Sequence, residues 1–230
     1  MKTIGLIGGM SWESTAVYYR LLNEIVRARL GGLHSAELLL WSFDFQEIEA
    51  CQAAGRWDRA TARMVEAARR LARGGAELLL ICTNTMHKMA PEVQAAVPIP
   101  LLHIADATAA PIKRRGLGRV GLLATAYTME QDFYRGRLEA EHGLEVLVPD
   151  AAGRKAVHEI IYDELCRGVI RAESKARYQE VVANLLAEGA EGVILGCTEV
   201  GLLIQEGDVP APVFDTTQLH AEAAVDAALA

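Results

Sequence analysis

An internal repeat constrains the fold of this chain more than any other feature of its sequence. Three pairs of similar segments occur in the same order at nearly equal separations. They are Gly75-Ala76-Glu77 and Gly189-Ala190-Glu191 (191 − 77 = 114), Val97-Pro98-Ile99-Pro100 and Val209-Pro210-Ala211-Pro212 (209 − 97 = 112), and Ile4-Gly5-Leu6-Ile7 and Val120-Gly121-Leu122-Leu123 (120 − 4 = 116). Such regular offsets predict two copies of one structural unit.

Each copy has the pattern of a parallel α/β unit, because short Leu- or Val-rich runs alternate with longer segments of helical period. The predicted strands are residues 3–8, 37–43, 77–82, 100–103, 119–124, 145–148, 192–196 and 212–214. The predicted helices are residues 14–30, 57–73, 105–115, 130–142, 154–167, 174–188 and 216–229. The sequence therefore predicts an α/β fold with two similar lobes, each a parallel sheet flanked by helices.

Ligands of open α/β sheets bind beyond the carboxyl ends of the strands, and two such lobes leave a cleft between them. We therefore expect the site in that cleft, on residues that directly follow strands. Extending the 114-residue offset places Thr83 at the same position as Cys197, and Asn84 at the same position as Thr198. Two half-sites that face one substrate suit the protonation of a planar carbanion from either side.

Composition narrows the possible partners. The formal net charge is −7 and the pI is about 5.4, without any basic run, so we expect no nucleic-acid partner. No apolar stretch approaches the roughly 18 residues of a membrane span, and the glycine-broken N-terminus does not resemble a signal peptide. Four scattered cysteines without a C-x-x-C pair suggest reduced thiols. These features favour a cytoplasmic protein that does not bind membranes.

Four segments together resemble the aspartate/glutamate racemase family. They are IGLIGGMSWES from Ile4 to Ser14, CTNTMHK from Cys82 to Lys88, ATAYTMEQ from Ala124 to Gln131, and GCTEV from Gly196 to Val200. The resemblance spans essentially the whole chain. It implies a small-molecule amino-acid substrate of the aspartate or glutamate type, neither pyridoxal phosphate nor metal as a cofactor, and a homodimer. It also implies that the last segment returns to the first lobe, so residues 1–98 and 209–230 would enclose residues 99–208.

In the family pattern, a thiolate on one lobe removes the α-proton while an acid on the other lobe protonates the opposite face. Cys197 of Gly-Cys-Thr matches the second of these groups, but Thr83 stands where the first half-site usually has cysteine. Cys82 lies one residue earlier, and neighbouring side chains of a strand point to opposite faces, so we interpret Cys82 as a packing residue. Thr83 and Cys197 are therefore the predicted catalytic pair.

This Thr/Cys pair predicts that proton transfer is faster on one face of the substrate than on the other. The reason is that a free thiol has a pKa of about 8.5, whereas an alkyl hydroxyl is a far weaker acid. We expect Cys197 to remove the α-proton efficiently and Thr83 to return it less well, with water as a possible intermediary. Family members with this pairing are implied to act chiefly on the L-enantiomers, which would assign Cys197 to the L face.

Further side chains are expected to hold the substrate. The resemblance assigns the carboxylate-binding role to the glycine-rich loop with Met10 and Ser11 and to a set of polar residues in three other loops. Those residues are Asn84, Thr85, Thr125 and Thr198. His158 is a candidate for the side-chain carboxylate, with a solvated surface histidine as the alternative. Residues 43–46 lack the arginine that some relatives carry, which leaves a broader amino-acid range open.

Two other functional classes remain compatible with the sequence. A single cleft cysteine would suffice for a decarboxylase or isomerase of small dicarboxylic acids. A protein of this fold that lacks one thiol could also be a non-catalytic amino-acid sensor. The G-x-G-x-x-G match at residues 116–121 precedes its strand instead of following it, so it does not indicate a nucleotide site.

Overall fold

The computed structural model describes residues 1–230, and the chain divides into two compact units. The first unit comprises residues 1–104 and 220–230, and the second comprises residues 105–219. The chain therefore leaves the first unit after Ile104 and returns to it at His220. No helix combines the length and the apolar character that are needed to cross a lipid bilayer.

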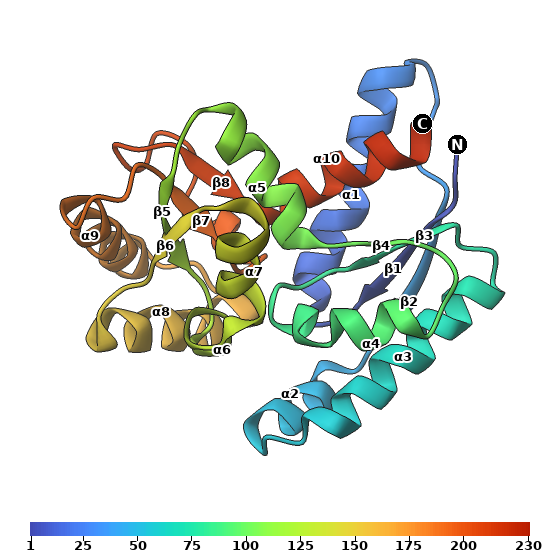
Figure 1. Ribbon diagram of the computed structural model, residues 1–230, viewed down its shortest axis with the longest axis horizontal. Coiled ribbons are helices and arrows are strands. Elements are labelled where there is room, and N and C mark those ends of the chain that lie inside the picture. Colours follow the sequence, from blue (N-terminus) through green and yellow to red (C-terminus); the bar gives the residue numbers. More distant parts are fainter. The chain divides into compact units, whose positions relative to one another are not determined.

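The first unit contains a four-stranded parallel sheet in the order β2-β1-β3-β4 (Figure 1). Its strands are β1 (Ile4–Gly8), β2 (Leu38–Ser42), β3 (Leu78–Ile81) and β4 (Leu101–Leu102). Its helices are α1 (Trp12–Leu30), α2 (Phe45–Ala53), α3 (Trp57–Arg73), the 3-10 helix η1 (Thr85–Met89) and α4 (Ala90–Ala95), together with most of α10 (Thr216–Leu229).

Helices cover both faces of this sheet, so alternate residues of its strands enter two different cores. Leu78, Leu80 and Cys82 pack with α1 and α10, whereas Leu79 and Ile81 pack with α2, α3 and α4. Burial of both faces explains why these strands read as continuous apolar runs in the sequence. Figure 1 shows α1 and α10 on one side of the sheet and α3 and α4 on the other.

The second unit repeats this sheet in the order β6-β5-β7-β8. Its strands are β5 (Arg119–Leu123), β6 (Glu145–Leu147), β7 (Val193–Leu195) and β8 (Val213–Asp215). Its helices are α5 (Ile104–Arg114), α6 (Ala126–Glu130), α7 (Asp132–His142), α8 (Ala151–Asp163), η2 (Leu165–Arg167), α9 (Ala172–Ala187) and η3 (Val200–Leu202). The prediction of an α/β fold with two similar parallel lobes is therefore confirmed.

The repeated Gly-Ala-Glu segment has the same structural role in both units. Glu77 accepts a hydrogen bond from the backbone N–H of Thr3 at 2.8 Å, and Glu191 accepts from Gly118 at 2.8 Å and from Arg119 at 2.9 Å. In each case the carboxylate binds backbone donors near the start of the neighbouring central strand. The sequence repeat therefore reflects one shared way of aligning two strands.

The structure also contains helices that the sequence pattern did not predict, namely α2, α4 and α6. Each is short, at 9, 6 and 5 residues, and too brief to display a clear helical period. A local signal for α2 was nevertheless present, because Asp44 caps its first turn by accepting from the backbone N–H of Gln46 at 3.1 Å.

Candidate active site

The predicted site residues form two groups, and each group belongs to one unit. Met10, Ser11, Thr83, Asn84 and Thr85 lie at the carboxyl ends of β1 and β3 in the first unit. The other group is in the second unit and consists of Thr125, His158, Cys197 and Thr198.

In the first unit, the loop after β1 requires glycine at position 9. Gly9 has a φ of 80°, and a Cβ atom there would come within 2.4 Å of the backbone of Phe43. Ser11 then caps α1 by accepting from the backbone N–H of Ser14 at 3.3 Å. This loop therefore brings the N-terminus of α1, with its backbone donors, directly to the end of β1, a geometry that suits an anion.

The loop after β3 lies against this first loop. The Ser14 hydroxyl is 3.4 Å from the carbonyl oxygens of both Ser11 and Cys82, so it joins the two loops. Cys82 is completely buried, and burial raises the pKa of its thiol. Thr83 is only partly buried. Accessibility therefore favours Thr83 over Cys82 as the reactive side chain.

In the second unit, Cys197 follows β7 and lies beside a buried carboxylate. Its Sγ is 3.0 Å from Oε2 of Glu199, and the Thr198 hydroxyl donates to the same oxygen at 2.8 Å. Glu199 is only 2% exposed and Cys197 is 8% exposed. The Glu199 carboxylate therefore accepts two hydrogen bonds, from a thiol and from a hydroxyl, in a buried position where such contacts are strengthened.

The electrostatics of this pair follow from burial and charge. Burial raises the pKa of the Cys197 thiol well above its ordinary value, and the negative charge of Glu199 raises that pKa further. The resting state is therefore a protonated thiol that donates to a carboxylate. A thiolate forms here only when its proton has somewhere to go, and the nearest acceptor is Glu199.

Thr125 and His158 meet near the start of α6. Thr125 caps this helix, with its hydroxyl 3.4 Å from the backbone N–H of Thr128. The backbone N–H of Ala126 donates to Nδ1 of His158 at 3.2 Å, which leaves the ring proton of a neutral imidazole on Nε2. Partial burial lowers the pKa of His158, although three nearby carboxylates oppose that shift.

Backbone contacts align the two half-sites residue by residue. The N–H of Cys82 donates to Ile7 at 2.9 Å, and the N–H of Gly196 donates to Leu123 at 2.7 Å, so these two residues occupy equivalent positions beside their central strands. Thr83 is then equivalent to Cys197. By the same alignment, Thr85 is equivalent to Glu199.

Glu199 was not among the residues predicted for the site, although the sequence carried a signal for it. It lies within the GCTEV segment, and its equivalent in the first half-site is a threonine, so the repeat itself distinguishes it. What the sequence could not show is that its side chain turns back onto Cys197 instead of reaching solvent.

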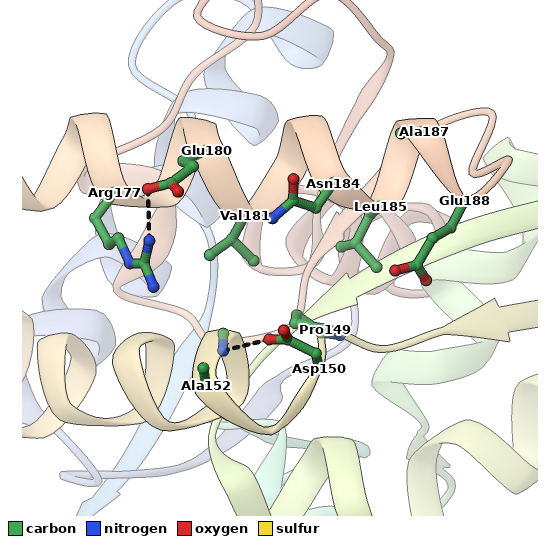
Figure 2. Close-up of a pocket in the computed structure, with 11 residues that line it drawn as sticks. Pro149, Asp150, Ala152, Arg177, Glu180, Val181, Asn184, Leu185, Ala187 and Glu188 are labelled. Carbon is green, nitrogen blue, oxygen red and sulfur yellow. Dashed lines mark hydrogen bonds and ion pairs between the residues drawn. The ribbon is translucent and has the colours of Figure 1, made fainter.

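A separate cavity of about 450 Å³ lies along α8 and α9 in the second unit, as Figure 2 shows. Asp150 at its edge caps α8 by accepting from the backbone N–H of Gly153 at 2.7 Å, and Arg177 pairs with Glu180. None of the predicted site residues lines this cavity. No group of three or more His, Cys, Asp or Glu side chains lies close enough together to hold a metal ion.

Comparison with known proteins connects this geometry to a family. The model of the Asp/Glu/Hydantoin racemase family matches residues 7–224. A protein from Yersinia pestis assigned to the Asp/Glu racemases is 55% identical, with a TM-score of 0.93 and full coverage of both chains. An aspartate racemase homologue from Pyrococcus horikoshii OT3 is 38% identical, with a TM-score of 0.87 and full coverage of both chains.

A further relative is the broad specificity amino-acid racemase RacX of Bacillus subtilis, which is 22% identical over 99% of this chain and 98% of its own length. These relatives are described as amino-acid racemases or their homologues, which are isomerases. The family match covers almost the entire sequence and both units. This chain belongs to the Asp/Glu/Hydantoin racemase family.

Proposed function

We propose that this protein racemises aspartate or glutamate without a cofactor, with Cys197 and Thr83 as the acid/base pair. The observation that carries the proposal is the 3.0 Å contact between the Cys197 thiol and the buried Glu199 carboxylate. This contact places a proton acceptor beside a nucleophilic group at the end of a central strand. The equivalent position in the other unit holds Thr83, the second member of the pair.

In the proposed first step, the Cys197 proton moves to Glu199, and the resulting thiolate takes the α-proton of the L-amino acid. The C–H electron pair remains on the α-carbon, and its negative charge spreads into the adjacent carboxylate. One proton has then moved from substrate to sulfur, and the thiol proton rests on Glu199. General bases positioned in this way contribute about 10² to 10⁴ in rate.

In the second step, the Thr83 hydroxyl or a water molecule beside it delivers a proton to the opposite face, which yields the D-amino acid. The enzyme is restored when Glu199 releases its proton to solvent and when the Thr83 hydroxyl, or the water beside it, takes up a proton from solvent. The carbanion requires donors at its carboxylate, because its charge is otherwise too costly. We assign these donors to the loop with Met10 and Ser11 and to the polar side chains of Asn84, Thr85, Thr125 and Thr198.

His158 is the proposed donor to the side-chain carboxylate of the substrate. With Nδ1 occupied by the Ala126 N–H, a neutral ring presents an N–H at Nε2, which can donate to one carboxylate oxygen. A neutral donor discriminates less strongly than a charged arginine. A neutral His158 would therefore allow some turnover of amino acids without a second carboxylate. The second candidate function is accordingly a broad-range amino-acid racemase.

A panel of L- and D-amino acids incubated with the protein and separated by chiral chromatography tests the proposal. We expect racemisation of aspartate or glutamate, with α-deuterium incorporation in heavy water faster from the L-enantiomer. Equal exchange from both enantiomers would contradict the assignment of Thr83. Turnover of maleate or an arylmalonate without racemisation would indicate a different thiol enzyme, and tight binding without exchange would indicate a sensor.

A homodimer and a cytoplasmic location complete the proposal. The family resemblance implies the homodimer, and the sequence features described above favour the cytoplasmic location. None of the four cysteines forms a disulfide, as is usual in a reducing compartment. Sedimentation of the purified protein tests the dimer, and fractionation of the producing cells tests the location.

A further inference from the structure

His87 is a buried side chain that the proposed reaction does not use. It lies in η1 and is 1% exposed. Its Nδ1 is 2.8 Å from the carbonyl oxygen of Thr83, and its Nε2 is 3.2 Å from the backbone nitrogen of Ile104. One imidazole ring therefore joins Thr83, two residues beyond the end of β3, to the first residue of α5.

These two contacts determine the protonation state of the ring. A backbone N–H can only donate, so Nε2 must accept from Ile104, and a carbonyl oxygen can only accept, so Nδ1 must donate to Thr83. Only the neutral tautomer with its proton on Nδ1 satisfies both contacts. A doubly protonated ring would lose the hydrogen bond from the Ile104 N–H.

The bridge lies where backbone pairing between the two strands has ended. β4 contains only two residues, and its register with β3 ends at Leu80 and Leu102. Beyond this point, Thr83 and Ile104 have no ladder to join them. The imidazole therefore performs the task of the missing backbone hydrogen bonds and holds the Thr83 peptide in place.

His220, in α10, supports the same segment from another side. Its Nε2 donates to the carbonyl of Leu102 at 3.0 Å, and its Nδ1 accepts from the Tyr18 hydroxyl at 2.9 Å. Burial lowers the pKa of His220 to about 3. The residues before and after His103 are thus held by two neutral imidazoles.

The second unit closes the equivalent gap differently. Thr216, which is equivalent to Ile104, donates its hydroxyl to the carbonyl of Leu195 at 2.8 Å. The Thr217 hydroxyl is 3.5 Å from the carbonyl of Thr198. Neither contact involves the Cys197 carbonyl. Only the first half-site has its reactive residue tied directly to the next element by a side chain.

We infer that His87 is a positioning residue for Thr83, which fixes the Thr83 peptide and thereby the direction of its hydroxyl. This inference rests on the proposed acid/base role of Thr83. A short hydroxyl is a weak acid whose effectiveness depends on placement, and a displacement of 1 Å can cost about 10² in rate. The thiol of Cys197 in the other unit does not depend on this bridge.

Two substitutions of His87 each keep one of its two hydrogen bonds and remove the other. In His87→Asn the side-chain amide can replace the Nδ1 donor to Thr83, whereas in His87→Gln the amide oxygen reaches the Nε2 position and retains only the Ile104 contact. The measured quantity is the rate of α-deuterium exchange from the L-enantiomer divided by the rate of racemisation. The control is His220→Phe, which disturbs the same buried cluster without touching Thr83.

We expect His87→Gln to raise this ratio about tenfold, because proton removal by Cys197 continues while delivery by Thr83 fails. His87→Asn and His220→Phe should keep the ratio within about twofold of the wild type, whatever their stability. Equal ratios in His87→Gln, His87→Asn and the wild type would overturn the inference. A merely structural role would lower both rates together and leave the ratio unchanged.

An activity-independent measurement tests the tautomer. Nitrogen-15 NMR of histidine-labelled protein should show the His87 proton on Nδ1, and a proton on Nε2 or on both nitrogens would overturn the bridge. A wild-type protein that exchanges neither enantiomer contradicts the proposed function. A wild-type racemase whose His87→Gln variant keeps the wild-type ratio contradicts only the role of His87.

Discussion

The two half-sites share a backbone and differ in chemistry. Equivalent hydrogen bonds place Thr83 and Cys197 at the same position after their strands, and Thr85 and Glu199 two residues further on. One half-site thus has two hydroxyls where the other has a thiol and a carboxylate. The duplicated scaffold therefore supplies equivalent positions, and the side chains at two of these positions give each copy a different chemistry.

The largest expected effect comes from removing the sulfur of Cys197. Cys197→Ser should lower both racemisation and L-enantiomer exchange by at least about 10³, because a hydroxyl is a much weaker base than a thiolate. Cys82→Ala is the matched control, since its thiol follows the other central strand but lies in the core. It should lower the melting temperature and retain activity. Loss of activity in Cys82→Ala alone would reverse the assignment.

Removal of the charge at Glu199 should have the next largest effect. Glu199→Gln keeps the size of the side chain but no longer accepts the thiol proton, so the rate at neutral pH should fall about 10². The variant's rate should then rise with pH as hydroxide replaces the missing acceptor, whereas the wild-type rate should vary less. Glu191→Gln, which alters a carboxylate near the amino end of β7, should leave the pH profile of the rate unchanged. A wild-type profile in Glu199→Gln would exclude Glu199 from proton transfer.

Substitutions in the first half-site should reduce the difference between the exchange rates of the two enantiomers. Thr83→Cys places a thiol in the first half-site, and exchange from the D-enantiomer should rise about tenfold relative to exchange from the L-enantiomer. Addition of Thr85→Glu should raise it further, because it completes the equivalent of the Cys197 and Glu199 pair. Thr83→Ala should instead abolish most racemisation and preserve L-enantiomer exchange. Unchanged enantiomer preference in Thr83→Cys would contradict the assignment of Thr83 to the D face.

The smallest effect concerns acid stability, and it arises in the first unit, where His220 is buried. The folded pKa of His220 is about 3, below the roughly 6.5 of an exposed histidine. The unfolded chain therefore binds the extra proton first. Stability is fully present above about pH 6.5 and declines toward pH 3, by at most about 1.4 kcal/mol per pH unit.

Urea unfolding between pH 7 and pH 4.5 measures this decline, and His220→Gln is the control because its amide can still donate to Leu102 but does not titrate in this range. The variant should lose stability less steeply than the wild type. Equal slopes in the two proteins would show that His220 is not buried in its neutral form.

Much of the fold could be predicted from the sequence because its signals are local or repeated. All eight strands follow from apolar runs, and the two sheets follow from the near-constant offset of Gly-Ala-Glu and the proline segments. The short helices α2, α4 and α6 could not be predicted from periodicity, because fewer than three turns rarely establish a helical pattern.

The site was less accessible to sequence reasoning. Alternation along β3 was sufficient to assign Cys82 to the core, since that inference needs only the period of a strand. The turn of Glu199 onto Cys197 and the bridge from His87 to Ile104 depend on side-chain direction in short loops. Those directions are determined by neighbouring elements that are remote in sequence, so no local pattern encodes them.

The return of the chain to the first unit has a consequence for biosynthesis. Ala221, Ala224 and Val225 of α10 pack against the same face of the first sheet as Leu6 and Leu80. The ribosome makes these alanines and this valine after the whole second unit. The internal unit can therefore fold while translation continues, whereas the unit that is begun first must wait with one sheet face uncovered until the final helix emerges.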